Sequence, residues 1–220
     1  MDDIFAAITA NDKDRVAQLI AADLGVAHTR NSAGISALMQ ARYENRMEIV
    51  DLLRPAAGDL DIFESSAFGD AAQLNKLLAS DADLVKARGA DGFTPLHLAC
   101  FFGQLKAAEI LVRHGADTNA VSPSRIAIIH SAAASRNADL LKLVLEAGAN
   151  PNSQQQRGYT ALHEAAMHNS VERAQALLKA GADPAIQSDE GQTAADMAAQ
   201  NGNKGVLEVL QSFRRGVASA

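Results

Sequence analysis

The sequence predicts an all-α solenoid, with about seven stacked helix–turn–helix units and projecting loops or short hairpins. Two phrases recur every 33 residues in the C-terminal half. The first, T-P-L-H-L-A with its variants, begins at Thr94, Ala127, Thr160 and Thr193. The second, G-A-D or G-A-N, begins at Gly115, Gly148 and Gly181. A fixed period of this length is typical of repeat architectures, in which each unit contacts only its neighbours.

Composition supports helices rather than sheets. Hydrophobic residues make up 48% of the 220 residues, yet aromatic residues make up only 4% and tryptophan is absent. The apolar content is mainly alanine and leucine, which favour closely packed helices. No run of 18 apolar residues exists, the N-terminus is acidic and there is one cysteine. These features predict a cytoplasmic protein without a membrane span, a secretory signal or a disulfide.

Charge narrows the class of partner. The net charge is −6, which argues against nucleic acid and anionic membranes. Residues 1–110 hold 10 Lys and Arg against 16 Asp and Glu, whereas residues 111–220 hold 10 of each. The N-terminal half is therefore expected to attract basic partners, in a salt-dependent way.

One repeat can be explained residue by residue. Thr94 can cap a helix with its hydroxyl, and Pro95 fits the first helical position, where its missing N–H costs nothing. This helix is expected to run to about Phe102, where Gly103 supplies a tight reversal. Residues 105–114 then form a second helix with one apolar face. Such a pair cannot bury its apolar faces alone, so the units must stack.

The T-P-L-H-x-A phrase at this period resembles the ankyrin repeat. The resemblance is strong over 93–200 and looser over 1–92. It implies a single ankyrin-repeat domain over 1–220, with the first and last units as caps. The expected units are 1–34, 35–58, 59–92, 93–125, 126–158, 159–191 and 192–220.

The period fails at two places. Leu38 and Ile62 are equivalent but only 24 residues apart, so about ten residues are missing from unit 2. We expect that the projecting loop is deleted there and that the second helix stops near Pro55 and Gly58. The alternative is that unit 2 is part of an N-terminal cap. In unit 5, Arg125 replaces the glycine of neighbouring loops, which predicts a different loop conformation or simple drift at a tolerant position.

No motif predicts catalysis, a cofactor or a metal. His97, His130 and His163 recur once per repeat. Helix neighbours lie ~8–10 Å apart, too far for equivalent atoms to share one ion. The resemblance implies instead that each imidazole hydrogen-bonds loop backbone. Cys100 is expected to be a small buried residue rather than a nucleophile. The sequence therefore predicts a protein that is not an enzyme.

The resemblance implies that a partner protein binds the concave groove and the loop tips. At matching positions, the expected partner-binding residues are Tyr43, Phe68, Asp91, Phe93, Phe101, Phe102, Ile126, Ser135, Arg157, Tyr159, Met167 and His168. Six of the nine aromatic residues fall in this set, and exposed aromatics suit a binding hot spot. The alternative is that some of them, first Phe93 and Phe101, pack between repeats.

Two functions remain open from the sequence. The first is a monomeric, non-enzymatic scaffold for protein–protein interaction. The second is a dedicated regulator or inhibitor of one partner enzyme, acting through the acidic N-terminal half. Association that slows sharply with added salt would favour the second.

Overall fold

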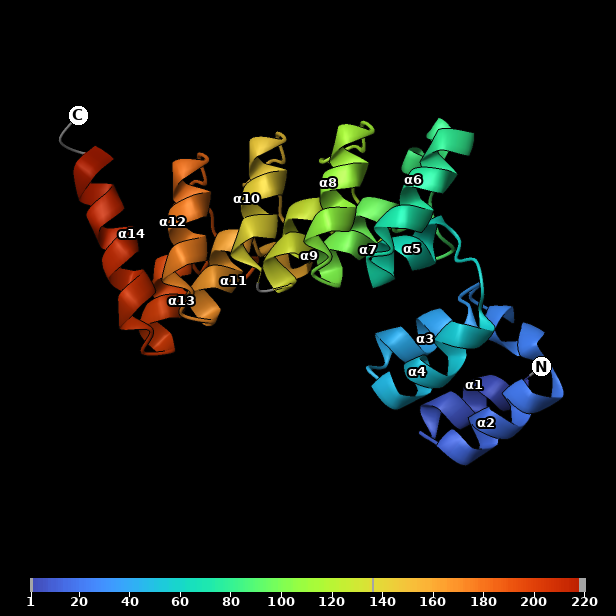
Figure 1. The fold of residues 1–220 in the computed structure, drawn as a ribbon. Coiled ribbons are helices and arrows are strands. Elements are labelled where there is room, and N and C mark those ends of the chain that lie inside the picture. The colour runs from blue at the N-terminus through green and yellow to red at the C-terminus, as the bar shows by residue number, and fades with distance from the viewer. Residues whose placement is uncertain (1, 136, 218–220) are drawn as a thin grey trace.

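The computed structural model describes residues 2–135 and 137–217, and these form an all-helical protein (Figure 1). The described helices alternate along the chain between the first and the second helix of each unit. The first helices are α1 (Asp2–Thr9), α3 (Ala37–Tyr43), α5 (Ile62–Phe68), α7 (Pro95–Phe101), α9 (Ile128–Ala134), α11 (Ala161–Met167) and α13 (Ala194–Gln200). The second helices are α2 (Lys13–Ala22), α4 (Met47–Ala56), α6 (Ala71–Ser80), α8 (Leu105–Arg113), α10 (Ala138–Glu146), α12 (Val171–Lys179) and α14 (Lys204–Val217). Short 3-10 helices lie at Leu24–His28, Ala82–Lys86 and Gln156–Gly158.

Helix ends follow the predicted local chemistry. The Thr94 hydroxyl accepts a hydrogen bond from the backbone N–H of His97, and Pro95 begins α7. Gly103 has a φ of 74°, the left-handed conformation that ends the first helix of that unit. Asparagine replaces glycine in units 1 and 2, where Asn11 and Asn45 both have a φ of 55°. Asparagine tolerates this conformation better than most residues.

Projecting hairpins, here called fingers, connect successive units. Within the described residues they span Asn31–Ile35, Gly89–Phe93, Ser122–Ile126, Gln155–Tyr159 and Ser188–Gln192. In each finger the first residue donates its N–H to the carbonyl of the fifth, and the fourth donates to the first, at 2.8–3.1 Å. Arg125, the fourth residue of its finger, has a φ of 63°. The predicted different conformation for this loop is therefore wrong, because Arg125 adopts the backbone that its neighbours reach with glycine.

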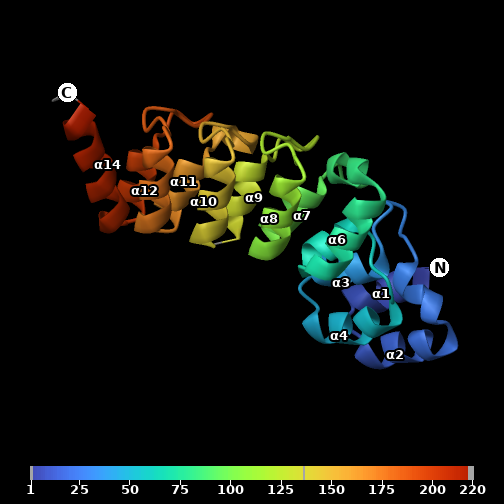
Figure 2. The ribbon, with the colours of Figure 1, turned by 45° about the horizontal axis from the view of Figure 1, so that its top comes forward.

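The connection between α4 and α5 carries no finger, in keeping with the short spacing in the sequence. Helix α4 continues through Pro55 and ends at Ala56, and α5 begins at Ile62. The N-terminal units, α1–α4, therefore do not extend the row formed by α5–α14. They lie beneath its end in Figure 1, and Figure 2 shows the same departure from a second direction.

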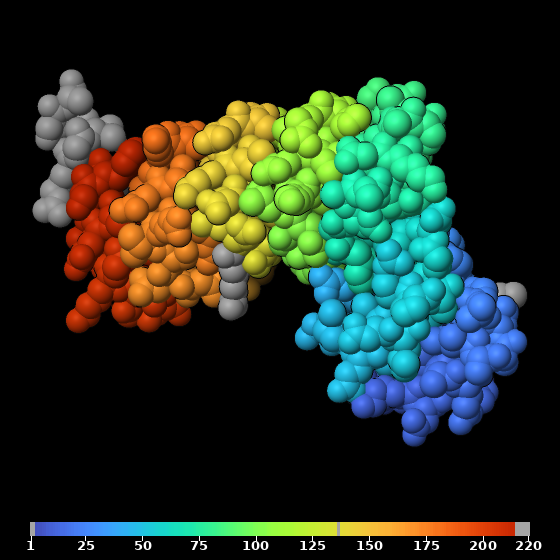
Figure 3. All heavy atoms as spheres, in the orientation of Figure 1, coloured from blue at the N-terminus to red at the C-terminus, as the bar shows by residue number. Residues whose placement is uncertain are grey.

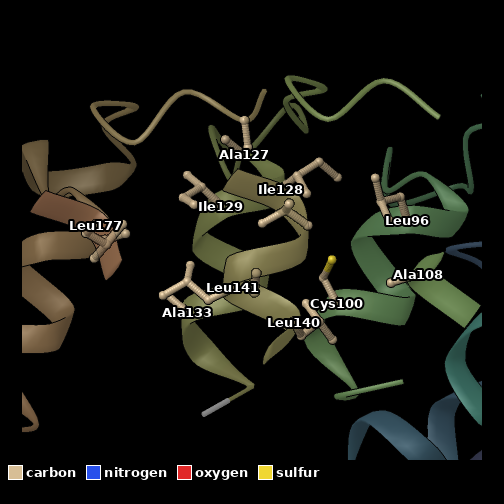
Figure 4. Packing of buried hydrophobic residues seen from close by; sticks show 14 of the residues in the cluster. Leu96, Cys100, Ala108, Ala127, Ile128, Ile129, Ala133, Leu140, Leu141 and Leu177 are labelled. Atoms are coloured by element: carbon tan, nitrogen blue, oxygen red, sulfur yellow. The ribbon is translucent and has the colours of Figure 1, made fainter. Parts of the chain in front are cut away.

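The cores reflect this break. Most buried apolar side chains between Ile4 and Leu60 form one cluster, and most of those between Ile62 and Leu210 form another. Figure 4 shows the second cluster, where Leu96 and Cys100 of α7 lie near Leu140 of α10. Cys100 is fully buried, as predicted, and burial raises the pKa of its thiol. Small and unbranched side chains allow these close helix contacts.

Candidate protein-binding surface

The repeat histidines brace the fingers. His97 Nδ1 accepts a hydrogen bond from the backbone N–H of Thr94 at 3.2 Å, so the neutral ring carries its proton on Nε2. That Nε2–H donates to the Ile126 carbonyl, 3.0 Å away in the next finger. The equivalent bond runs from His163 to the Gln192 carbonyl, whereas His130 bonds the Ser153 carbonyl, just before the next finger. Burial lowers the pKa of all three imidazoles, that of His97 to about 4. The expected bonds to loop backbone are confirmed.

The expected partner-binding residues divide between two regions. Seven lie along the row of units 4–6: Phe101, Ile126, Ser135, Arg157, Tyr159, Met167 and His168. The other five lie where the N-terminal units meet the row, a region here called the corner: Tyr43, Phe68, Asp91, Phe93 and Phe102.

On the first helices of the row, Phe101 and Met167 are large apolar side chains that remain exposed. Phe101 at the end of α7 is 48% exposed, and Met167 at the end of α11 is 41% exposed. They occupy the same position two repeats apart, with Ala134 between them. The sequence leaves open that Phe101 packs between repeats, but about half of its surface remains exposed. The three residues form an exposed line along the first helices.

The finger of unit 6 presents a charged tip. Arg157 pairs with Glu190 of the following finger and lies 5.0 Å from the centre of the Tyr159 ring. Tyr159 in turn stacks on His163, with ring centres 5.7 Å apart. Tyr159 is half-buried, so it supports the finger and is only partly available to a partner.

At the corner, the aromatic side chains pack against one another. Met39, Ala67 and Leu98 form a small buried cluster drawn from α3, α5 and α7. The half-buried residues around this cluster are Ile35, Tyr43, Phe63, Phe68, Phe93 and Phe102. Tyr43, Phe68 and Phe102 are therefore half-buried rather than exposed as expected, and Phe93 packs as the alternative interpretation allowed. The deleted finger lets α3 fold against α5 and α7, which covers positions that stay open in a continuous row.

Polar bonds also fix the N-terminal units at the corner. Ser36 donates its hydroxyl to Glu64 Oε1 at 2.6 Å, and Glu64 is only 1% exposed. Arg30 pairs with Asp61 at 2.9 Å. Glu64 stands near the place that histidine takes in later repeats, and this substitution is the signal by which the sequence could have revealed the contact.

A cavity of about 250 Å³ lies at the corner, between the first two fingers. Its walls include the side chains of Arg30, Ile35, Met39, Phe63, Arg88 and Leu98. The tips of these two fingers are close together at the cavity. A Cβ atom placed on Gly34 would lie only 2.7 Å from the Cβ of Ala90.

These features define a helical repeat solenoid with an exposed line of side chains on its first helices. The chain belongs to the ankyrin-repeat family: the family model for three copies of ankyrin repeats matches residues 4–122, 62–155 and 129–216. Ankyrin repeats are protein-binding modules, so the chain is a scaffold of the kind that mediates protein–protein interaction.

Curated relatives match in short segments. The chain is 36% identical over 75 residues to the serine/threonine-protein kinase VIK of Arabidopsis thaliana, covering 34% of this chain and 17% of that protein. It is 41% identical over 54 residues to human ankyrin repeat domain-containing protein 13B, covering 24% of this chain and 9% of that protein. It is 33% identical over 85 residues to chicken inversin, covering 39% of this chain and 8% of that protein. The chain thus spans less than a fifth of each.

Membrane-spanning and metal-binding features are absent from the described part of the chain. No helix within residues 2–135 and 137–217 is long and apolar enough to cross a membrane. Over the same ranges, no group of three or more His, Cys, Asp or Glu side chains could hold a metal ion.

Proposed function

We propose that this chain is a non-enzymatic scaffold that binds one partner protein along its first-helix row and finger tips. The observation that carries the proposal is the exposed line of Phe101, Ala134 and Met167. A large aromatic side chain left in solvent costs free energy that a partner recovers by covering it. Residues 1–220 would act as one domain, as a monomer in the cytoplasm, with the corner setting where the groove ends.

The line has the dimensions of a peptide-sized contact. Neighbouring helices lie ~8–10 Å apart, so Phe101 and Met167 are separated by roughly 20 Å. An extended chain rises about 3.3 Å per residue, so about six residues of a partner would span them. Aromatic anchors of this kind dominate binding energy in many interfaces.

The test compares two variants with a matched control. The wild-type chain is used to capture and identify a partner from cells of its source organism, and the dissociation constant of the pair is then measured. Phe101→Ala and Met167→Ala are expected to weaken binding by about tenfold or more each, which is ~1.4 kcal/mol. Leu24→Ala removes another exposed apolar side chain, 65% exposed and in the 3-10 helix of unit 1, and should bind like wild type. Unchanged binding by both row variants would rule out the row as the contact surface.

A regulator of one enzyme is the second candidate. The acidic balance of residues 1–110 favours it, because a negative surface speeds association with a basic partner. Added salt should then slow association with the captured partner while changing dissociation little, and activity of that partner should fall on binding. Salt-independent association would count against this role and leave the scaffold role intact.

A further inference from the structure

Arg42, near the end of α3, lies in an unusual environment at the corner. Its guanidinium carbon is 4.7 Å from the centre of the Phe102 ring and 5.4 Å from that of Phe68. Its Nη1 contacts the sulfur of Met47 at 3.3 Å, a weak acceptor. Its Nε is buried and has no hydrogen-bond partner. The side chain is half-buried, and burial lowers the pKa of its guanidinium.

No carboxylate neutralises this cation. Within the described residues, Arg42 has no carboxylate oxygen within 4.0 Å. The other arginines of units 1 and 2 near the corner form ion pairs: Arg30 with Asp61, Arg46 with Glu44 and Arg54 with Asp70. Arg46 Nε also lacks a hydrogen-bond partner, but it faces Glu44 at 3.7 Å. Arg42 is thus a partly desolvated positive charge without a carboxylate partner, whose hydrogen bond to Met47 is a weak one.

An unpaired, partly buried guanidinium favours a carboxylate ligand. A buried donor without a partner costs about 1–3 kcal/mol, and more when it is charged. The buried Nε is out of reach of a partner, but the terminal N–H groups of a guanidinium held against aromatic rings stay in its plane and can form the paired bonds that carboxylates accept. The surrounding rings exclude water, which strengthens such a bond.

Arg42 also lies beside the exposed line of Phe101, Ala134 and Met167, to which Phe102 connects it. Phe102 contacts both the Arg42 guanidinium and the ring of Phe101, whose centre is 5.1 Å away. Figure 3 shows an open angle between the N-terminal units, in blue and cyan, and the row that runs from green to red. A chain segment lying in this angle along the first helices would pass from Arg42 to Phe101 and on towards Met167.

We propose that Arg42 binds an aspartate or glutamate side chain of the partner protein, at one end of an extended segment whose apolar residues cover Phe101 and Met167. This inference rests on the proposed function, because it names the chemistry of the segment that the row binds. The chain carries a net charge of −6, so a single carboxylate at this cation suits it better than a polyanion.

The experiment selects ligands from random sequences, so the partner need not be identified first. A displayed library of random linear peptides is selected on the wild-type chain, and the recovered peptides are measured against variants. Peptides that need Phe101 and Met167 are expected to carry Asp or Glu at a fixed distance before their apolar residues. Arg42→Gln should weaken them by about tenfold, or ~1.4 kcal/mol. Exchanging the peptide carboxylate for its amide should cause the same loss, with no further loss when both changes are combined.

A matched control distinguishes a change in net charge from the loss of the Arg42 site. Arg113→Gln removes an exposed arginine at the end of α8, with the same change in net charge, and should leave peptide binding unchanged. The unfolding midpoint of Arg42→Gln should remain close to that of wild type, so that a binding loss reports on the site rather than on folding.

The outcomes distinguish the two proposals. Peptides that depend on Phe101 and Met167, but show no acidic preference and bind Arg42→Gln equally well, would overturn the role of Arg42 and support the scaffold. Peptides whose binding is indifferent to Phe101 and Met167 would contradict the proposed function itself and this inference with it.

Discussion

The Tyr43 hydroxyl donates a hydrogen bond to Asp91 Oδ2 at 2.8 Å, across 48 residues of sequence. Asp91 Oδ1 meanwhile accepts the backbone N–H of Phe93 at 3.0 Å, so one carboxylate shapes its own finger and holds α3. Burial, together with the adjacent Asp91 charge, raises the pKa of the Tyr43 hydroxyl, so it remains a donor. The bond ties the N-terminal units to the row at the place where the repeat is interrupted.

Tyr43→Phe tests this attachment. The ring contacts remain and only the hydroxyl is lost, so we expect a loss of about 1 kcal/mol in the free energy of unfolding. Amide hydrogen exchange in α3 should speed up, because the N-terminal units separate from the row more often. Tyr159→Phe removes a hydroxyl that makes no hydrogen bond within the described part of the chain, and serves as the control. Equal stability of the two variants would show that the bond to Asp91 contributes nothing.

The sequence predicted well those features that depend on local contacts. The caps of α7, the reversal at Gly103 and the backbone bond of His97 all arise between residues that are near in sequence or one repeat apart. Each repeat presents the same contacts again, so the period carries this information. The finger of Arg125 is the exception, because there the bonds common to every finger override the residue's own preference.

The corner could not be predicted in this way. Where a finger is deleted, the 33-residue period no longer predicts which helices contact each other. Those contacts depend on how side chains such as Met39 and Leu98 pack. Tyr43 and Phe102 occupy positions that are exposed in an uninterrupted row, so the period predicts exposure where the structure has packing. The sequence gives no signal for Arg42, because its environment is created only when α3 packs against α5 and α7.

Arg125 offers a gain in stability. A residue with a side chain costs ~1–2 kcal/mol in the left-handed conformation, whereas glycine adopts it freely but loses ~0.5–1 kcal/mol to the entropy of the unfolded chain. Arg125→Gly should therefore raise the free energy of unfolding by roughly 0.5 kcal/mol. Gly92→Ala is the converse, since Gly92 has a φ of 78° and its new Cβ would lie 2.3 Å from Pro123 Cδ. Urea unfolding should place the two variants on opposite sides of wild type.

Stability should fall in mild acid because of the buried histidines. The folded pKa of His97 is about 4 against an ordinary 6.5, so between these values the unfolded chain binds more protons. The contribution is complete above the unfolded pKa and is lost as the pH falls below it. From about pH 7 to about pH 5, His97 accounts for a loss on the order of 2 kcal/mol, with His130 and His163 adding in the same direction. Urea unfolding across this range should show a shallower decline for His97→Gln, and parallel curves would contradict the assignment.

Phe101 and Phe102 are neighbours in sequence, but they should respond differently to replacement by alanine. Phe102 packs on the Tyr43 ring, with centres 5.6 Å apart, and beneath the Arg42 guanidinium, so its loss removes contacts between α3 and α7. We expect Phe102→Ala to lower the free energy of unfolding by ~2–3 kcal/mol, below the full cost of a buried phenylalanine because the ring is only half-buried. Phe101→Ala should cost less than ~1 kcal/mol, since that ring is 48% exposed. Chemical unfolding of both variants measures how much each side chain stabilises the corner. Partner or peptide binding, measured on the same samples, shows which side chain remains available to a partner. A larger stability loss in Phe101→Ala than in Phe102→Ala would reverse these roles.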